Sequence, residues 1–206
     1  MNEGLLLIVS APSGAGKTSL VAALLEGDPQ LTMSVSHTTR SRRLRELDGV
    51  NYHFVTRETF LAMAARDEFL EHAEVFGHLY GSSSGGVADL RRQGRDVILE
   101  IDYQGARQIR ARHPDAISVF ILPPSRSTLA QRLQNRGEDA ESVIRERLAK
   151  ARLEIASYAE YDYLVVNDTF QDALGDLVAI VRAERLRMAR QQDRLGAMLG
   201  ELLSDS

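Results

Sequence analysis

The amino-acid sequence predicts an α/β fold in which a parallel sheet is flanked by helices and carries a phosphate-binding loop (P-loop). Three observations lead to this prediction. Short, continuous apolar runs recur along the chain, as they do in strands that are buried on both faces. Helical patterns lie between or after these runs, in the order that produces a parallel sheet with helices on both faces. The first run leads into a glycine-rich segment that opens a helix.

The predicted core has four strands. They are Leu5–Val9, Val97–Asp102, Ile117–Leu122 and Tyr163–Asn167. The predicted helices around them are Thr18–Leu25, Ser127–Asn135, Glu141–Tyr158 and Ala173–Leu203, and a break in the last helix is expected near Gly196. This last helix is apolar enough to pack on the core or on a partner subunit, and the sequence leaves both alternatives and the oligomeric state open.

Two segments interrupt this alternation. In the first, strand-like Asn51–Val55 and Phe69–Phe76 lie on either side of helical Glu58–Asp67, and four glycines lie in the ten residues after Phe76. We expect an inserted α+β lobe at about 35–89 within a single domain, 1–206. A second, charged excursion is expected at about 133–149, which leaves 1–34, 90–132 and 150–206 as the core.

Composition excludes several classes of protein. The chain has 206 residues, a hydrophobic fraction of 44%, which is enough for one sizeable core, and a net charge of -4. Nucleic-acid binders are usually basic, so we expect no nucleic-acid partner. The absence of cysteine excludes disulfides and thiolate metal sites. The acidic start and the short apolar run behind it predict neither a signal peptide nor a membrane span, so we expect a cytoplasmic protein with no membrane partner.

The glycine-rich segment has the residues of a phosphate loop. It runs through Ala11, Pro12, Ser13, Gly14, Ala15, Gly16, Lys17 and Thr18. Glycines let backbone N–H groups turn towards phosphate oxygens, and the helix N-terminus adds free donors and a positive dipole end. Lys17 would reach the β- and γ-phosphates, and the Thr18 hydroxyl would ligate Mg²⁺. Ala11 replaces the usual first glycine, which requires a negative φ there. The alternative is an ordinary glycine-rich turn with a capping Thr.

Motifs beyond this loop carry a family resemblance. They are a Ser-x-Thr-Thr-Arg segment ending at Arg40, a Tyr-Gly-Ser at Tyr80–Ser82, the strand Leu99–Asp102 with Gln104 and Gly105, and Val166–Asp168. With them the chain resembles the bacterial guanylate kinases over nearly its whole length. The resemblance implies Mg²⁺-dependent phosphoryl transfer from ATP to GMP, giving ADP and GDP, in purine nucleotide metabolism, with dGMP as a further acceptor.

The resemblance also implies a GMP site in the inserted lobe. Arg40, Arg43, Tyr52 and Tyr80 match the positions that hold the GMP phosphate. Guanidinium forks and phenols suit a dianion, since they add charge and direction. Glu71 matches the residue that accepts from guanine N1–H and the 2-amino group, a pair of donors that adenine lacks. Ser36, Ser82 and Asp102 match further base contacts.

Each of these residues also has a simpler interpretation. Arg40 and Arg43, with Arg42 and Arg45, could form a solvated basic face, in a chain that has only two lysines. Tyr52 and Tyr80 could be core residues with a hydrated tip. Glu71 could lie on the exposed face of an alternating strand. Arg42 and Arg45 replace the Pro and Gly of the family pattern, and we assign neither a phosphate role.

The second excursion corresponds to a lid over ATP in the family. Arg136 and Arg147 match arginines that contact the transferring phosphates, and with Lys17 and Arg43 they form the expected catalytic set. Asn167 matches a residue near the adenine, and its alternative is a turn-forming Asn. Glu100 stands where many relatives carry Asp.

Two other functions compete with this interpretation. Guanylate kinase-like domains also occur as protein-interaction modules, but these would show a damaged phosphate loop or lost lid arginines. A kinase for another acceptor, such as AMP or dTMP, would not need Glu71 with Ser82.

Overall fold

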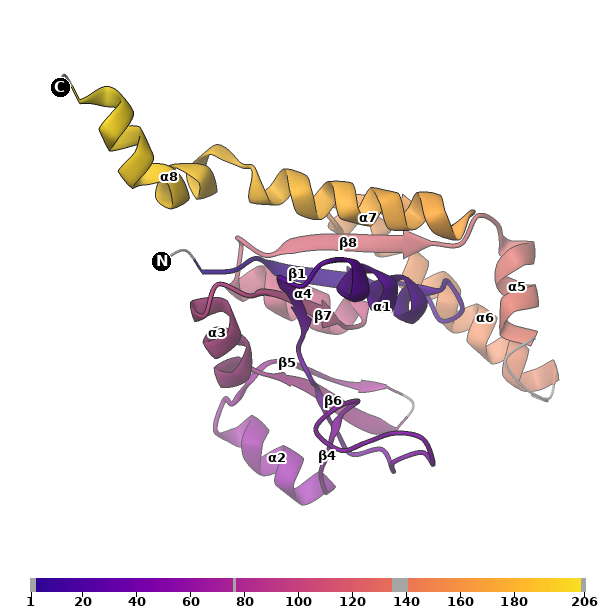
Figure 1. Ribbon diagram of the computed structural model, residues 1–206. Helices are drawn as coiled ribbons and strands as arrows, with labels where there is room; N and C mark the ends of the chain where they lie inside the picture. The colour runs from indigo at the N-terminus through magenta and orange to yellow at the C-terminus, as the bar shows by residue number, and fades with distance from the viewer. Residues whose placement is uncertain (1–2, 76, 135–140, 205–206) are drawn as a thin grey trace.

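The computed structural model describes residues 3–75, 77–134 and 141–204. In this part of the chain, a parallel five-stranded sheet has the order β2-β7-β1-β8-β9 (Figure 1). Its strands are β1 (Leu6–Ser10), β2 (Leu31–Met33), β7 (Asp96–Glu100), β8 (Ile117–Leu122) and β9 (Tyr163–Val166). The predicted α/β fold is therefore confirmed, and the four predicted core strands are present. The three-residue strand β2 was not predicted.

Helices cover both faces of this sheet. They are α1 (Lys17–Gly27) and α7 (Phe170–Arg185) on one face, and α3 (Ser84–Arg92) and α4 (Tyr103–Arg112) on the other. Leu7 and Val9 of β1 pack on the first pair, and Leu6 and Ile8 pack on the second. Because successive side chains of a strand point to opposite faces, the continuous apolar run of β1 is what a doubly covered strand needs.

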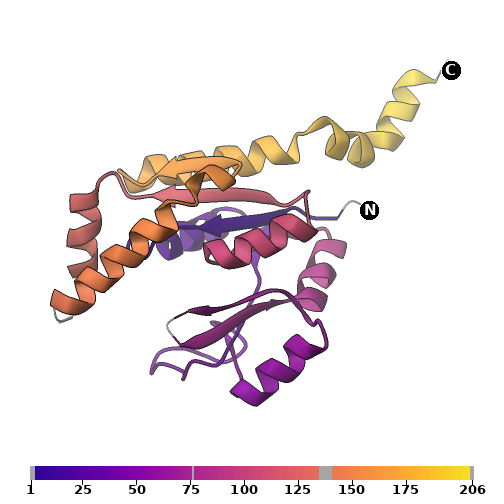
Figure 2. The same cartoon turned by 180° about the vertical axis from the view of Figure 1, so that it is seen from behind.

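A second, four-stranded sheet lies beside the main one (Figures 1 and 2). Its order is β4-β3-β6-β5, with β3 (His37–Thr38), β4 (His53–Phe54), β5 (Phe69–Val75), β6 (His78–Ser83) and helix α2 (Arg57–Ala65) packed on it. Phe60 of α2 stacks on Phe69 of β5. The sequence predicted β4, α2 and β5 but neither β3 nor β6. The boundaries 35–89 and 133–149 stay predictions.

Helices α5 (Arg126–Gln134) and α6 (Glu141–Ile155) stand beyond the carboxyl ends of the strands and share a small core. Leu129, Leu133 and Ala151 are its buried members. Helix α6 ends three residues before the predicted Tyr158, which instead begins a 3-10 turn, η1 (Tyr158–Glu160). None of the helices in the described residues is long and apolar enough to cross a bilayer.

The predicted break near Gly196 was wrong. The chain bends at Leu186 and Arg187, between α7 and α8 (Met188–Leu203), and Gly196 lies inside α8. Glu184 is buried and accepts hydrogen bonds from the Tyr163 hydroxyl and from the Arg187 guanidinium. Arg187 has an extended backbone (φ -56°, ψ 136°), so the helix cannot continue through it. The ion pair between Arg187 and Glu184 lies at this end of α7. Helix α8 then projects away from the sheet (Figures 1 and 2).

Candidate functional site

The phosphate loop connects β1 to α1 at the carboxyl edge of the main sheet, where ligands bind in open α/β sheets. Gly14 and Gly16 have φ of 90° and 92°, values that side chains rarely adopt. Among the described residues other than glycine only Asp67 has a positive φ. Ala11 therefore has the negative φ that an alanine needs at this position. The loop backbone therefore turns at its two glycines, Gly14 and Gly16.

Asn167, at the end of β9, holds this loop from the side. Its Nδ2 donates to the Ala15 carbonyl at 2.7 Å, and a Cβ on Gly16 would lie only 2.3 Å from that nitrogen. Arg132 of α5 donates to the Asn167 carbonyl at 3.2 Å. The Asn167 side chain is thus a buried clamp on the loop, and the turn-forming alternative does not describe it.

Lys17, Thr18 and Glu100 meet at the start of α1. The Thr18 hydroxyl donates to Glu100 Oε1 at 2.6 Å, and Lys17 Nζ lies 3.7 Å from the same oxygen. A hydroxyl and a carboxylate are hard oxygen ligands of the kind that Mg²⁺ prefers. Among the described residues no group of three or more His, Asp or Glu side chains could hold a metal ion.

A pocket of about 140 Å³ opens between the two sheets, beside Lys17. Its lining brings together residues from the loop, the inserted lobe and the end of β7. From the predicted site it contains Lys17, Ser36, Tyr52, Glu71, Tyr80 and Asp102, with Glu100 also in its wall. Ser82 reaches it through Glu71. The structure thus joins residues that are up to 85 positions apart in the sequence, from Lys17 to Asp102.

Glu71 is buried at the back of this pocket, contrary to the exposed alternative, with 4% of its surface accessible. The pairing of β5 with β6 shifts register between Phe69 and Glu71, and this irregularity places Glu71 opposite Ser82. The Ser82 hydroxyl donates to Glu71 Oε1 at 2.7 Å. The pKa of Glu71 is raised to about 7, chiefly because the carboxyl is buried; the bond from Ser82 opposes this rise and the nearby Asp102 charge adds to it.

Gly105 and Asp102 complete the wall around Glu71. A Cβ on Gly105 would lie 2.4 Å from Glu71 Oε2, so only glycine leaves room for the carboxylate. Asp102 caps α4: its Oδ1 accepts from the backbone N–H groups of Gln104 and Gly105, and its Oδ2 accepts from Gln104 Nε2. The Asp102 carboxylate, which is predicted to contact the base, therefore also caps helix α4.

Glu46 organises the arginine-rich loop, a role that the sequence does not predict. Arg40 donates to both Glu46 oxygens, at 2.7 and 3.0 Å, and its guanidinium lies 5.4 Å from the centre of the Tyr52 ring. The Arg43 backbone N–H donates to Glu46 Oε2, and Arg42 donates to the Glu46 carbonyl. The ion pair with Arg40 lowers the pKa of Glu46. Arg40 thus belongs to a folded cluster, while the Arg43 and Arg45 side chains are exposed.

Of the two lid arginines, Arg147 lies half-buried on α6, and Arg136 lies outside the described residues.

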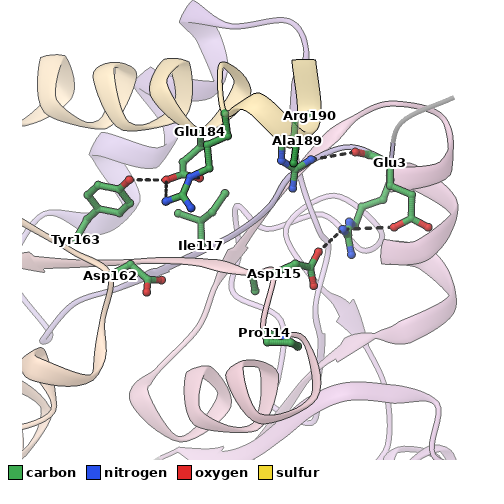
Figure 3. A pocket seen from close by; sticks show the side chains of 12 residues that line it. Glu3, Pro114, Asp115, Ile117, Asp162, Tyr163, Glu184, Ala189 and Arg190 are labelled. Atoms are coloured by element: carbon green, nitrogen blue, oxygen red, sulfur yellow. Dashed lines mark hydrogen bonds and ion pairs between the residues drawn. The ribbon is translucent and has the colours of Figure 1, made fainter. Parts of the chain in front are cut away.

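A larger cavity, of about 480 Å³, lies elsewhere. Figure 3 shows it at the junction of Glu3, Asp115, Tyr163 and Glu184. Ile117 and Tyr163 are the first residues of β8 and β9, so this cavity is at the amino edge of the sheet, opposite the phosphate loop. It contains none of the predicted site residues, and its acidic and basic side chains are largely paired with one another.

Comparisons with known proteins agree on one family. The family model described as guanylate kinase matches residues 3–184. The chain is 56% identical over 202 residues to a guanylate kinase of Pseudomonas fluorescens (98% of each chain) and 53% identical over 207 residues to one of Vibrio cholerae (100% of each). Among solved structures it is similar to a guanylate kinase from Anaplasma phagocytophilum, with a TM-score of 0.77, 33% identity and 94% of each chain covered.

Proposed function

This chain belongs to the guanylate kinase family and is an ATP:GMP phosphotransferase, and from that premise we propose which of its residues carry the reaction. The observation that supports the proposal is the pocket beside Lys17, because it combines a phosphate-loop lysine with the buried Glu71. A donor bound on the loop and an acceptor bound in the pocket would meet at the lysine.

We propose that GMP lies in this pocket with its base towards Glu71. Glu71 would accept from guanine N1–H and the 2-amino group, with Ser36, Ser82 and Asp102 around the base. The phosphate would lie beside Tyr52 and Tyr80, whose rings are in edge contact with centroids 5.9 Å apart, and within reach of Arg40 and Arg43. We propose that dGMP is accepted as well.

The loop residues 11–18 would surround the ATP phosphates and bind them through backbone N–H groups, except at Pro12, which has none, and at Ser13, whose N–H donates to Glu154. Mg²⁺ would be held by Thr18, with Glu100 beside it, and would neutralise phosphate charge. Lys17, Arg43, Arg136 and Arg147 would stabilise the charge that develops on the transferring phosphoryl group, so catalysis needs no covalent intermediate. Asn167 would support the loop beside the adenine site. We place this activity in the cytoplasm, with neither nucleic acid nor membrane as a partner.

An acceptor series tests the assignment of the base site. ADP release would be followed by a coupled assay with ATP and Mg²⁺, using GMP, dGMP, AMP, dTMP and CMP in turn. We expect turnover with GMP and dGMP alone. Comparable turnover with AMP or dTMP would contradict the guanine-selecting role of Glu71, and folded protein that binds GMP without turnover would instead fit an interaction module.

Gly105→Ala is expected to raise the KM for GMP roughly tenfold or more and to leave the KM for ATP unchanged. The added Cβ would lie 2.4 Å from Glu71 Oε2, so the carboxylate must move out of its buried position. Gly175→Ala is the matched control, because Gly175 also lies in a helix and nothing is within 4 Å of its Cβ position. Steady-state kinetics of the two variants decide the matter: equal KM values for GMP would contradict this role of Gly105.

A further inference from the structure

The underside of the phosphate loop rests on the α5–α6 pair. A Cβ on Gly14 would lie 3.0 Å from Leu129 and 3.1 Å from Leu133, two residues of the small core that these helices share. The loop backbone at Gly14 thus packs directly on α5. Helix α6 reaches the same part of the loop through Glu154, one residue before its end at Ile155.

Glu154 is an unexpected neighbour for an anion-binding loop. It is 8% exposed, and its Oε2 accepts a hydrogen bond from the Ser13 backbone N–H at 3.2 Å. Burial raises the pKa of this carboxyl, while the bond from Ser13 and the charges of Lys150 and Lys17 lower it. A buried carboxylate near a phosphate site is costly, and the cost is offset only where the oxygen is satisfied by donors. Here the donor belongs to the loop itself.

The same helix also carries a proposed phosphate ligand. Arg147 and Glu154 are seven residues apart on α6, which is two turns or about 10 Å, so they share one face of the helix. A fixed bond from Glu154 to the loop therefore sets the distance at which α6 holds Arg147 from bound phosphates.

We propose that Glu154 is a positioning residue for the ATP site. Its carboxylate fixes the phosphate loop through the Ser13 N–H and so holds helix α6 at a fixed position relative to the loop. The residue acts through the loop and does not touch the substrate. The proposal rests on the proposed function of the loop as the ATP site, and it adds a residue that no motif of the loop contains.

Glu154→Leu removes the acceptor and keeps the volume of the side chain, and Glu154→Gln keeps an acceptor oxygen but removes the charge. Loss of a hydrogen bond to a charged group is worth roughly tenfold in affinity or more. For Glu154→Leu we therefore expect the Kd for a fluorescent ATP analogue, and the KM for ATP, to rise about tenfold or more. The KM for GMP should stay within about twofold of the wild type, and Glu154→Gln should remain close to the wild type in all three. Glu146→Gln, an exposed glutamate on the same helix, is the matched control.

Each other outcome contradicts the proposal. Tighter ATP binding in both variants would mean that Glu154 only repels phosphate. Equal weakening by Leu and Gln would assign the effect to charge, and a parallel rise of both KM values with a lowered Tm would assign it to general stability. If Lys17→Ala bound the analogue as well as the wild type does, the loop would not be the ATP site, and that failure is separate from any result at Glu154.

Discussion

Lys17→Ala is expected to lower kcat/KM on the order of 10²–10³-fold, because one fixed cation next to the transferring phosphoryl group is lost. The fold should be unaffected. In the described contacts Lys17 Nζ makes only a 3.7 Å ion pair with Glu100 and a 3.5 Å hydrogen bond to the Ile101 carbonyl. Contacts of that length contribute little to the free energy of unfolding, whereas charge at the reacting phosphate acts fully in the transition state.

Three measurements separate this role from a structural one. Circular dichroism and the Tm of Lys17→Ala should match the wild type within a few degrees. Lys17→Arg keeps the charge but not the geometry, and should recover only part of the activity. Arg92→Ala removes an exposed cation from α3 and should have wild-type kinetics. Turnover of Lys17→Ala within about threefold of the wild type would remove Lys17 from the mechanism.

The phosphate loop and its strand could be predicted from the sequence because their signals are local. A strand that is buried on both faces needs an unbroken apolar run. The strand Leu6–Ser10 lies on such a run, and the segment that contains Gly-Lys-Thr comes directly after it. Strands β2 and β3 have only three and two residues, and pairing with β7 and β6 holds them, so local patterns did not indicate them. The helix break at Leu186 and Arg187 likewise involves the long-range contact between Glu184 and Tyr163. Gly196 suggested a break because glycine is a poor helix former, but no break occurs there.

The site residues were named by family motifs, but their partners were not. Glu154 is 141 positions from Ser13, and no spacing rule connects them. Nothing in the sequence connects Glu46 with Arg40 or with the Arg43 backbone N–H, and its function as their acceptor follows only from the folded loop. The burial of Glu71 depends on the register shift in β5, which an alternating pattern does not predict.

Glu71→Gln is expected to lower kcat/KM for GMP by roughly 10²-fold or more. A carboxylate offers two acceptors to guanine N1–H and the 2-amino group, whereas the amide offers one acceptor and opposes the other donor with its own NH₂. A buried donor left without a partner is what makes such sites selective. IMP keeps N1–H but lacks the 2-amino group, so its kcat/KM should fall less, and the preference for GMP over IMP should shrink.

Glu74→Gln provides the matched control. Glu74 lies on the same strand, three residues further on, and its exposed carboxylate faces Arg57 at 3.5 Å, so the GMP kinetics of this variant should equal those of the wild type. An unchanged preference for GMP over IMP in Glu71→Gln would show that the base is read elsewhere.

The pH profile gives an independent test of the same carboxyl. Burial raises the pKa of Glu71 to about 7 in the free protein, and only the ionised form can accept both guanine donors. The KM for GMP should therefore be constant above about pH 8 and should rise below pH 7, approaching tenfold per pH unit, because binding must first remove a proton. The GMP phosphate has its own ionisation near pH 6, but that one is shared by Glu71→Gln. The wild-type profile divided by the Glu71→Gln profile thus isolates Glu71, and a flat ratio between pH 6 and 8 would mean that guanine is not bound through this ionisation.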